Sequence, residues 1–217
     1  MNVPIITIDG PVASGKGTVA RAVAEALGFH LLDSGAIYRA HALACLNRDI
    51  KSNEIKSLTA IAQALSLKFS GDRIALDGHD VTTAVRTEAV GMMASTLSAI
   101  PEVRAALFDR QRAFAQPPGL VADGRDMGTV IFPDAGTKVF LTASAEERAR
   151  RRYKQLKEKG LAVTLAALLR EIEARDARDA ARPVAPLKPA TDAVLIDSTG
   201  MPVDAVVAKV LSLVHSA

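Results

Sequence analysis

The first residues whose types and spacing suggest chemistry are Gly-Pro-Val-Ala-Ser-Gly-Lys-Gly-Thr, positions 10–18 of the 217-residue chain. The spacing of the two outer glycines and Lys16 fits the phosphate-binding pattern G-x-x-x-x-G-K. The β-branched run 4–9 predicts a buried strand before this loop, and the apolar face over 16–27 predicts a helix after it. Between such elements, backbone N–H groups and a helix N-terminus form an anion site, to which Lys16 adds a positive charge.

Gly17 stands where the common form of this loop has a Ser or Thr whose hydroxyl binds Mg²⁺. We therefore expect Thr18 to offer its hydroxyl to a phosphate, and Mg²⁺ to be held mostly by nucleotide oxygens and water. The ending Gly-Lys-Gly-Thr is similar to that of nucleoside monophosphate kinases, which transfer phosphoryl groups between small molecules. A GTPase is disfavoured because its guanine-reading Asn-Lys-x-Asp is missing: no asparagine in the sequence precedes a lysine.

A second candidate segment is DSGAIYR, residues 33–39, at the start of a predicted helix. It follows a short predicted strand at 29–33, and ligands of open α/β sheets bind at the carboxyl ends of strands. Ser34 and Arg39 flank one helical turn there and are candidates for ligand contact. Taken alone, Ser34 fits a helix cap and Arg39 a solvated helix arginine.

A third segment, ADGRDMGTVIFPDA at 122–135, combines glycines with charged residues directly after an apolar strand. Asp123 would stand at the strand end, where a carboxylate can hold a water on Mg²⁺. Arg125 and Asp126 would project into the cleft. The alternative is a salt-bridged turn, which the segment by itself would favour.

The fourth segment, RDARDAAR at 175–182, places Arg175, Arg178, Asp179 and Arg182 on one predicted helical face. Three arginines on one face repel each other unless they meet anions. Such a face suits a lid that neutralises a transferring phosphoryl group. The alternative is a solvated helix whose arginines pair with neighbouring carboxylates.

The basic helix predicted over 148–159 raises a different class of function, nucleic-acid binding. Its single aromatic residue, Tyr153, and its interleaved glutamates argue against this class, because single-stranded nucleic acids need stacking aromatics. The formal net charge of +3 is too small to favour nucleic acid or membranes. We therefore expect no nucleic-acid partner.

The predicted elements that must position these segments alternate between strands and helices, which indicates a parallel sheet covered by helices. Further buried strands are predicted at 119–124, 137–143 and 192–197, and a last helix at 202–215. Two stretches break this rhythm. Turn signals over 66–82 predict a small antiparallel sheet, followed by helices at 87–99 and 101–116. In the other stretch, Ser144 and Glu147 predict a capping box before the basic helix, which Gly160 ends, and the helix at 170–182 follows.

Composition fits a soluble protein with a sizeable core, since hydrophobic residues make up 49% and charged residues 24% of the chain. The single cysteine, Cys45, excludes an internal disulfide and fits a reducing compartment. The four histidines show no zinc-ligand spacing. No apolar run reaches the length of a membrane span and no signal peptide is evident, so we expect a cytoplasmic protein without a membrane partner.

Four segments in this order resemble the bacterial-type cytidylate kinase family over nearly the whole chain: ITIDGPVASGKGT, LLDSGAIYR, ADGRDMGTVIFPDA and ARDARDAARPVAPL. The resemblance implies the α/β fold of a P-loop nucleoside monophosphate kinase, with a five-stranded parallel sheet in the order 2-3-1-4-5. It implies transfer of the γ-phosphoryl group of ATP, with Mg²⁺, to CMP or dCMP, in a monomer. It divides the chain into a core (1–65, 106–147 and 183–217), an acceptor-binding insertion (66–105) and a lid (148–182).

The resemblance also assigns a role to each candidate residue. The ATP phosphates would be held by the loop Gly10, Pro11, Val12, Ala13, Ser14, Gly15, Lys16, Gly17 and Thr18. The CMP phosphate would be held by Ser34, Arg39 and Arg125, and cytosine would be contacted by Ser95, Arg104 and Asp126. Arg175 and Asp179 would meet the ribose, and Arg175 and Arg182 the phosphates. Lys16, Arg125, Arg175 and Arg182 would be catalytic. No direct metal ligand is assigned, although Asp123 fits a water-mediated one. Ala180 departs from family members that carry a further lid arginine there.

Overall fold

The computed structural model describes residues 3–158 and 160–214. The chain divides into two compact units. One, Met1–Leu32 with Phe114–Ala217, holds the large sheet and is called the sheet unit here. The other, Asp33–Ala113, is mostly helical and is called the helical unit. The functional division into core, insertion and lid is a separate prediction.

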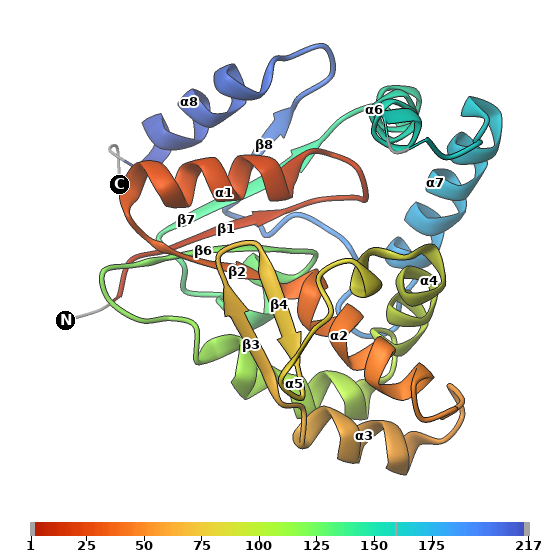
Figure 1. Ribbon diagram of the computed structural model, residues 1–217. Coiled ribbons are helices and arrows are strands. Elements are labelled where there is room, and N and C mark those ends of the chain that lie inside the picture. Colours follow the sequence, from red (N-terminus) through yellow and green to blue (C-terminus); the bar gives the residue numbers. More distant parts are fainter. Residues whose placement is uncertain (1–2, 159, 215–217) are drawn as a thin grey trace. The chain divides into compact units, whose positions relative to one another are not determined.

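The sheet unit is built on five strands in the order β2-β6-β1-β7-β8 (Figure 1). Counted along the chain, these strands give the order 2-3-1-4-5, so the predicted sheet topology is confirmed. The pairings of β1 with β6 and β7, and of β7 with β8, are parallel. The strands are β1 Ile5–Asp9, β2 His30–Asp33, β6 Leu120–Gly124, β7 Thr137–Thr142 and β8 Val194–Asp197.

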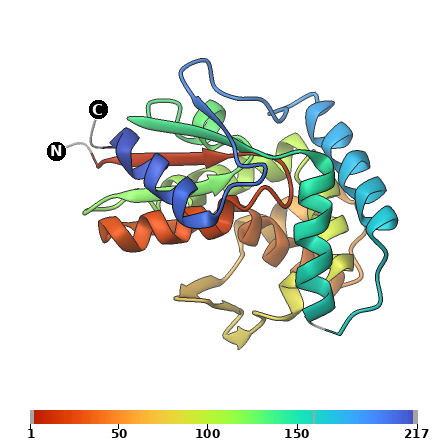
Figure 2. The same cartoon turned by 90° about the horizontal axis from the view of Figure 1, so that it is seen from above.

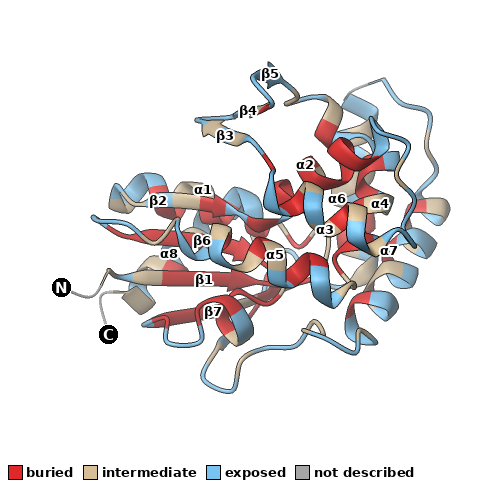
Figure 3. Cartoon of the chain, turned by 90° about the horizontal axis from the view of Figure 1, so that it is seen from below, coloured by how far each residue is buried: buried red, intermediate tan, exposed pale blue. Residues whose placement is uncertain are grey.

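The core of the sheet unit lies between the sheet and two helices, α1 (Lys16–Leu27) and α8 (Val203–Val214) (Figure 1). The strands β1 and β6 are buried almost throughout, as the continuous apolar runs predicted (Figure 3). Ile6 and Ile8 of β1 belong to this core. Because side chains alternate along a strand, Thr7 and Asp9 point to the opposite face of the sheet. Asp9 is thereby a buried carboxylate at the carboxyl end of the central strand.

Two further helices of the sheet unit, α6 (Ala145–Glu158) and α7 (Leu165–Ala180), lie side by side (Figure 2). A small apolar cluster joins them through Ala149 of α6 and Leu168 and Ile172 of α7. The predicted capping box is half formed, because the Glu147 N–H donates to Ser144 Oγ at 3.2 Å but the Ser144 N–H donates to Thr199 Oγ1 at 3.0 Å. Glu147 instead pairs with Arg151 at 3.0 Å, because that guanidinium lies one helical turn away.

The helical unit contains four α-helices, a 3₁₀ turn and a small sheet. The predicted antiparallel sheet is confirmed, with β4 paired to β3 and to β5. In the helices, α2 contacts α3 and α4, and α3 contacts α5. The elements are α2 Ser34–Leu46, α3 Ile55–Gln63, β3 Leu67–Ser70, β4 Arg73–Leu76, β5 His79–Asp80, η1 Ala84–Arg86, α4 Glu88–Leu97 and α5 Pro101–Arg112.

Three elements were not predicted: α3, the 3₁₀ turn η1, and a π-helical turn, η2 (Met127–Ile131), that follows β6. The predicted end of the last helix, His215, lies outside the described residues, whereas α8 is described to Val214. Within residues 3–158 and 160–214, every helix is too short or too polar to span a lipid bilayer.

Candidate active site

The loop 10–18 follows β1 and leads into α1, as the sequence predicts. Gly10 has φ 156° and Gly15 φ 89°, backbone conformations that side chains disfavour. At Gly10 a Cβ would also lie 2.0 Å from the Leu141 carbonyl oxygen, so only glycine fits there. Ala13 has φ 59°, a conformation rarely adopted by non-glycine residues and most often retained at functional sites.

Lys16 begins α1 and is buried, and its ammonium donates to the Pro11 carbonyl at 3.1 Å. This contact places the Lys16 side chain back over the loop residues that precede α1. The positive group therefore lies beside the N-terminus of α1, where backbone N–H groups and the helix dipole already favour an anion. The loop therefore lies between a strand and a helix as predicted, and phosphate binding by it stays a prediction.

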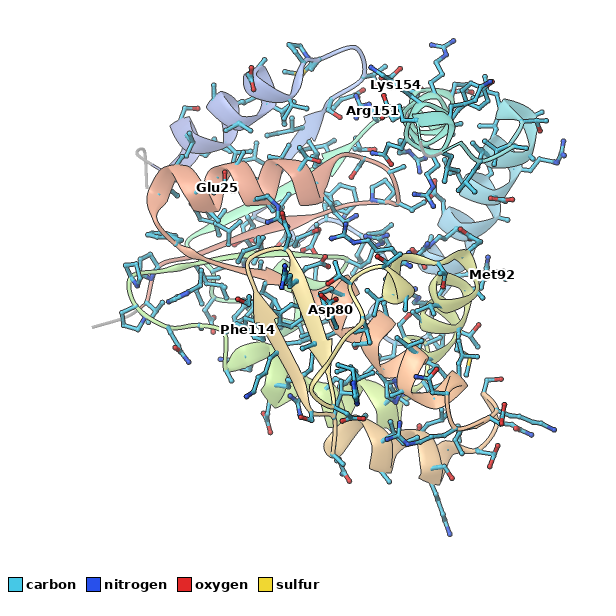
Figure 4. The ribbon with its side chains drawn as sticks, viewed as in Figure 1. Glu25, Asp80, Met92, Phe114, Arg151 and Lys154 are labelled. Carbon is cyan, nitrogen blue, oxygen red and sulfur yellow. The ribbon has the colours of Figure 1, made fainter. Side chains whose placement is uncertain are left out.

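Two arginines of α6 hold the loop by its carbonyl oxygens. Arg148 Nη1 donates to the Val12 carbonyl at 3.2 Å, and Arg151 Nη1 to the Ser14 carbonyl at 3.1 Å. Because the C=O and N–H of a peptide unit point in opposite directions, these contacts turn the adjoining N–H groups away from α6. Figure 4 shows Arg151 on the side of α6 that faces the segment after β8, where it also donates to the Ser198 carbonyl at 2.6 Å.

Arg148 links the loop to α7. Its guanidinium forms a two-point ion pair with Asp176 of α7, at 3.1 and 2.5 Å, and its Nε donates to the Ala143 carbonyl at 2.9 Å. The Arg148 side chain is only 6% exposed, so this pair is largely shielded from water. The basic helix is therefore partly committed to contacts within the sheet unit, which the nucleic-acid alternative did not anticipate.

The turn after β6 carries Arg125 and Asp126. Its first two N–H groups after Asp126 donate to the Asp9 carboxylate, Met127 to Oδ1 at 2.9 Å and Gly128 to Oδ2 at 2.8 Å. The Asp126 carbonyl accepts from Val130 at 2.9 Å and from Ile131 at 3.2 Å, which closes the π-helical turn η2. Asp126 is itself buried, with 4% exposure.

Burial raises the pKa of Asp9 to about 6. The hydrogen bonds from Gly128 and Met127 oppose this shift, because they favour the ionised carboxylate. Among nearby charges, Asp126 raises the pKa of Asp9 further and Lys16 lowers it. Asp9 thus interacts electrostatically with the phosphate loop and with the turn after β6, two of the three candidate segments of the sheet unit.

Asp179 joins the turn to the end of α7. It is fully buried, and its carboxylate accepts from Arg125 Nε at 3.2 Å and from Nη2 of Arg182. Arg182 lies just beyond the last residue of α7, and Arg175 is half-buried on that helix. The predicted arginine face is only partly correct, because Arg178 is exposed and donates to the Ala174 carbonyl at 3.4 Å. Asp179 turns inward from the same helix.

The helical unit carries the other four candidates, each in a defined environment. Asp33 caps α2 by accepting from the Ala36 N–H at 2.9 Å, which leaves the Ser34 hydroxyl to donate to Gln111 Oε1 at 2.7 Å. Ser34 is therefore not the cap. Ser95 is buried on α4.

Both arginine candidates of the helical unit donate to backbone carbonyls. Arg39 of α2 donates to Val85 at 3.0 Å, and Arg104 of α5 to Ser98 at 3.2 Å. At Gly91 a Cβ would lie 3.0 Å from both terminal nitrogens of Arg39, so a glycine there gives this side chain its room. The guanidinium of Arg104 also lies over the Tyr38 ring, 6.0 Å from its centroid.

The position of Gly17 beside the Asp123 carboxylate bears on how a metal ion could be held there. A Cβ at Gly17 would lie 3.1 Å from Asp123 Oδ2, so the missing side chain leaves room beside this carboxylate. Among the described residues, no three or more His, Cys, Asp or Glu side chains gather as a metal site. A carboxylate with space beside it, without a dedicated cage, fits a water-mediated contact to a Mg²⁺ held mainly by nucleotide phosphates.

Sequence reasoning missed the roles of Asp9, Gln111, Arg148 and Arg151. For Asp9 a signal was present, because an acidic residue at the end of an otherwise apolar strand is costly to bury unless it is hydrogen-bonded. For Arg148 and Arg151 no signal distinguished them from the neighbouring arginines of the basic helix. The partners that tie them to the rest of the sheet unit, Asp176 for Arg148 and Ser14 and Ser198 for Arg151, lie more than 20 residues away along the chain.

Comparison with known proteins gives consistent results. The family model described as "Cytidylate kinase" matches residues 6–216. The chain is 57% identical to a protein named cytidylate kinase from Ralstonia pickettii (strain 12J), over 97% of this chain and 91% of that protein. It is also 57% identical to one of the same name from Methylococcus capsulatus (strain ATCC 33009 / NCIMB 11132 / Bath), over 99% and 98%. An uncharacterized protein from Eubacterium ventriosum ATCC 27560 shares the fold, with 13% identity, 99% coverage of both chains and a TM-score of 0.51.

Proposed function

Since the chain belongs to the cytidylate kinase family, we propose that it transfers the γ-phosphoryl group of ATP to CMP and dCMP, forming CDP and dCDP. One observation carries the proposal. The phosphate loop and the turn with Arg125 and Asp126 start from paired residues of neighbouring strands, Asp9 of β1 and Gly124 of β6. A donor phosphate on the loop and an acceptor on the turn would therefore meet at one edge of the sheet.

The reaction we propose is a direct in-line transfer. An oxygen of the CMP phosphate attacks the γ-phosphorus, the bond to the β,γ-bridging oxygen breaks, and ADP leaves. The acceptor phosphate is already an anion, so no general base is required. The enzyme forms no covalent intermediate.

Lys16 would stabilise negative charge on the transferring group, together with Arg125, Arg175 and Arg182. Mg²⁺, bound with ATP, would supply further positive charge to the phosphate oxygens. Asp123 would orient a water on that ion beside Gly17, and Thr18 would offer its hydroxyl to a phosphate. The contact of Arg125 and Arg182 with Asp179 keeps both guanidiniums near the turn until phosphates compete for them.

The resemblance also assigns residues to CMP. Ser34, Arg39 and Arg125 are proposed for its phosphate, and Ser95, Arg104 and Asp126 for cytosine. Cytosine offers an amino donor at N4 and acceptors at N3 and O2, which suits a carboxylate together with Arg and Ser donors. Uracil presents an acceptor at position 4 and a donor at N3, so the same residues would reject it.

Closure of the insertion 66–105 and the lid 148–182 over the substrates would exclude water that otherwise hydrolyses ATP. Arg175 and Asp179 of the lid would meet the ribose. From the resemblance we also propose a monomer acting in the cytoplasm.

An acceptor screen tests the proposal. ATP and Mg²⁺ are offered with CMP, dCMP, UMP, AMP, GMP or shikimate in turn, and ADP formation is measured. We expect CMP and dCMP to be the best acceptors. Turnover of AMP or shikimate with CMP inert would contradict the proposed substrate. A protein inert with all six that binds an oligonucleotide with a steep salt dependence would favour nucleic-acid binding instead.

A further inference from the structure

The carboxylate of Asp9 is the feature from which a further role follows. It accepts the Met127 and Gly128 N–H groups, one on each oxygen, at 2.9 and 2.8 Å. These residues are 118 and 119 positions away along the chain. The contact therefore joins the end of β1, directly before the phosphate loop, to the turn directly after Asp126.

The surroundings of Asp9 leave this turn little freedom. Asp9 is 5% exposed, so its charge depends on the donors that it meets inside the protein. At Gly128 a Cβ would lie 2.8 Å from Thr7 Oγ1, and at Gly124 a Cβ would lie 2.7 Å from Met127 Cγ. The turn is thus seated against β1 without space for added side chains.

We propose that Asp9 is a positioning residue for the acceptor side of the reaction: its carboxylate fixes the turn so that Arg125 and Asp126 can contact CMP. This inference rests on the proposed function, because the contacts of Arg125 and Asp126 with CMP are part of it. Asp9 itself need not touch either substrate. A catalytic turn held by two hydrogen bonds to a buried carboxylate is preorganised, which is what transfer between two bound phosphates requires.

The inference predicts an effect on one substrate. The phosphate loop has its own supports, from Lys16 to Pro11, from Arg148 to Val12 and from Arg151 to Ser14. Loss of the Asp9 carboxylate should therefore disturb CMP use more than ATP use. A general loss of folding would instead lower both together.

The main test compares Asp9→Asn with Thr7→Val by steady-state kinetics with each substrate varied. Asparagine keeps one oxygen acceptor and places an NH₂ group against the second backbone N–H. We expect kcat/KM for CMP to fall about ten- to a hundredfold, with KM for ATP within about twofold of wild type. Thr7→Val is the matched control. It alters the same face of β1, and the Thr7 hydroxyl has no hydrogen-bond partner among the described residues. Its activity should equal that of the wild type.

A second pair of variants moves the same turn without changing Asp9. Gly128→Ala sets a methyl group against Thr7 Oγ1 and should also lower kcat/KM for CMP. Adding Thr7→Ala removes that obstacle, so the double variant should recover most of the lost activity. Rescue of this kind would show that the position of the turn, and not the glycine itself, matters.

Amide hydrogen exchange gives a readout independent of catalysis. In Asp9→Asn the Met127 and Gly128 amides should exchange faster, while the amides of loop 10–18 keep their wild-type rates. At pH 8 the melting temperature of Asp9→Asn should change little, since removal of a buried charge and the mismatch of the new NH₂ with a backbone N–H act in opposite directions.

The outcomes separate this inference from the proposed function. A wild-type protein that phosphorylates no CMP would overturn the proposed function and this inference with it. An active wild type with an equally active Asp9→Asn variant would overturn only the inference. Equal losses for ATP and CMP would also overturn it, because Asp9 would then act through the phosphate loop.

Discussion

The phosphate loop and the turn after β6 leave neighbouring strands at the same edge of the sheet, but their conformations are determined differently. The backbone path of the loop is set mainly by residues within it, since Gly10 and Gly15 have positive φ and Lys16 bonds to Pro11, and Arg148 and Arg151 of α6 add support. The turn depends on Asp9, more than 100 residues earlier. A local pattern can therefore be found in a sequence, whereas a conformation imposed from a distance needs the fold.

The difference also separates two electrostatic designs. In the loop, the positive charge of Lys16 lies beside backbone N–H groups and lowers the pKa of Asp9 at the end of β1. In the turn, Arg125 already has an internal anion, the fully buried carboxylate of Asp179. We therefore expect substitutions in the loop to affect every acceptor alike, and substitutions around the turn to change the choice of acceptor or the rate after binding.

Lys16→Ala should have the largest effect and lower transfer to the assay background with every acceptor. The lysine acts on the donor phosphates, mainly in the transition state, so kcat and kcat/KM should fall together. ADP formation with CMP and dCMP measures both. Lys209→Ala, which removes the same charge from an exposed position of α8, is the control and should remain fully active. A Lys16→Ala variant with near-normal kcat would show that the loop is not the donor site.

Arg182→Ala should lower kcat by roughly 10³ or more, with a much smaller change in CMP affinity. Asp179 holds Arg182 at the end of α7, and we expect Arg182 to reach the transferring group only as the lid closes. Rapid-quench kinetics together with CMP binding by calorimetry separate the two quantities. Arg178→Ala removes an exposed arginine of the same helix and should have little effect. Weakened CMP binding with normal turnover at saturation would instead make Arg182 a ground-state ligand.

Asp126→Asn should raise KM for CMP and narrow the preference for CMP over UMP. A carboxylate can only accept hydrogen bonds, whereas asparagine can turn its NH₂ group toward the uracil carbonyl. A base-edge contact of this kind discriminates by about 1–3 kcal/mol, so the ratio of kcat/KM values should fall roughly ten- to a hundredfold. If Asp126 only holds the turn, both substrates should suffer equally and the melting temperature should drop. Asp134→Asn, an exposed substitution nearby, is the control.

Much of the sheet unit could be predicted from the sequence, because its signals are local. Continuous apolar runs marked the strands, and the glycine pattern marked the loop between β1 and α1. The helix over 16–27 has the predicted bounds. The strand order came from the resemblance, since periodicity alone does not say which strands pair.

The features that the sequence did not predict have two physical causes. Some depend on partners that are distant in the sequence, and others have weak local signals. The turn η2 is held by Asp9, and the position of Arg148 by Asp176, and neither partner is near in the sequence. The helix α3 has nine residues and buries only Leu58 and Ala62, too few for a clear periodic pattern. The candidate residues of the loop lie between β1 and α1, where the sequence predicts them, while the roles given to all candidate site residues stay predictions.

The smallest expected effect is on the stability of the protein, through Asp9, the residue that links the loop and the turn. The pKa of Asp9 is about 6 in the folded protein, against 3.8 for an aspartate in water, so the folded state binds this proton more tightly than the unfolded chain. Stability from this group is therefore present below about pH 4 and is lost as the pH rises through about 6, by up to about 3 kcal/mol. We expect the melting temperature of the wild type, minus that of Asp9→Asn, to decrease from pH 4 to pH 7 and then stay constant. Carboxylates whose pKa is lowered, such as Asp192 and Asp197, act equally in both proteins and cancel in this difference. A difference that increased with pH would mean that the hydrogen bonds from Met127 and Gly128 outweigh burial, and that the turn stabilises the ionised carboxylate more strongly than water does.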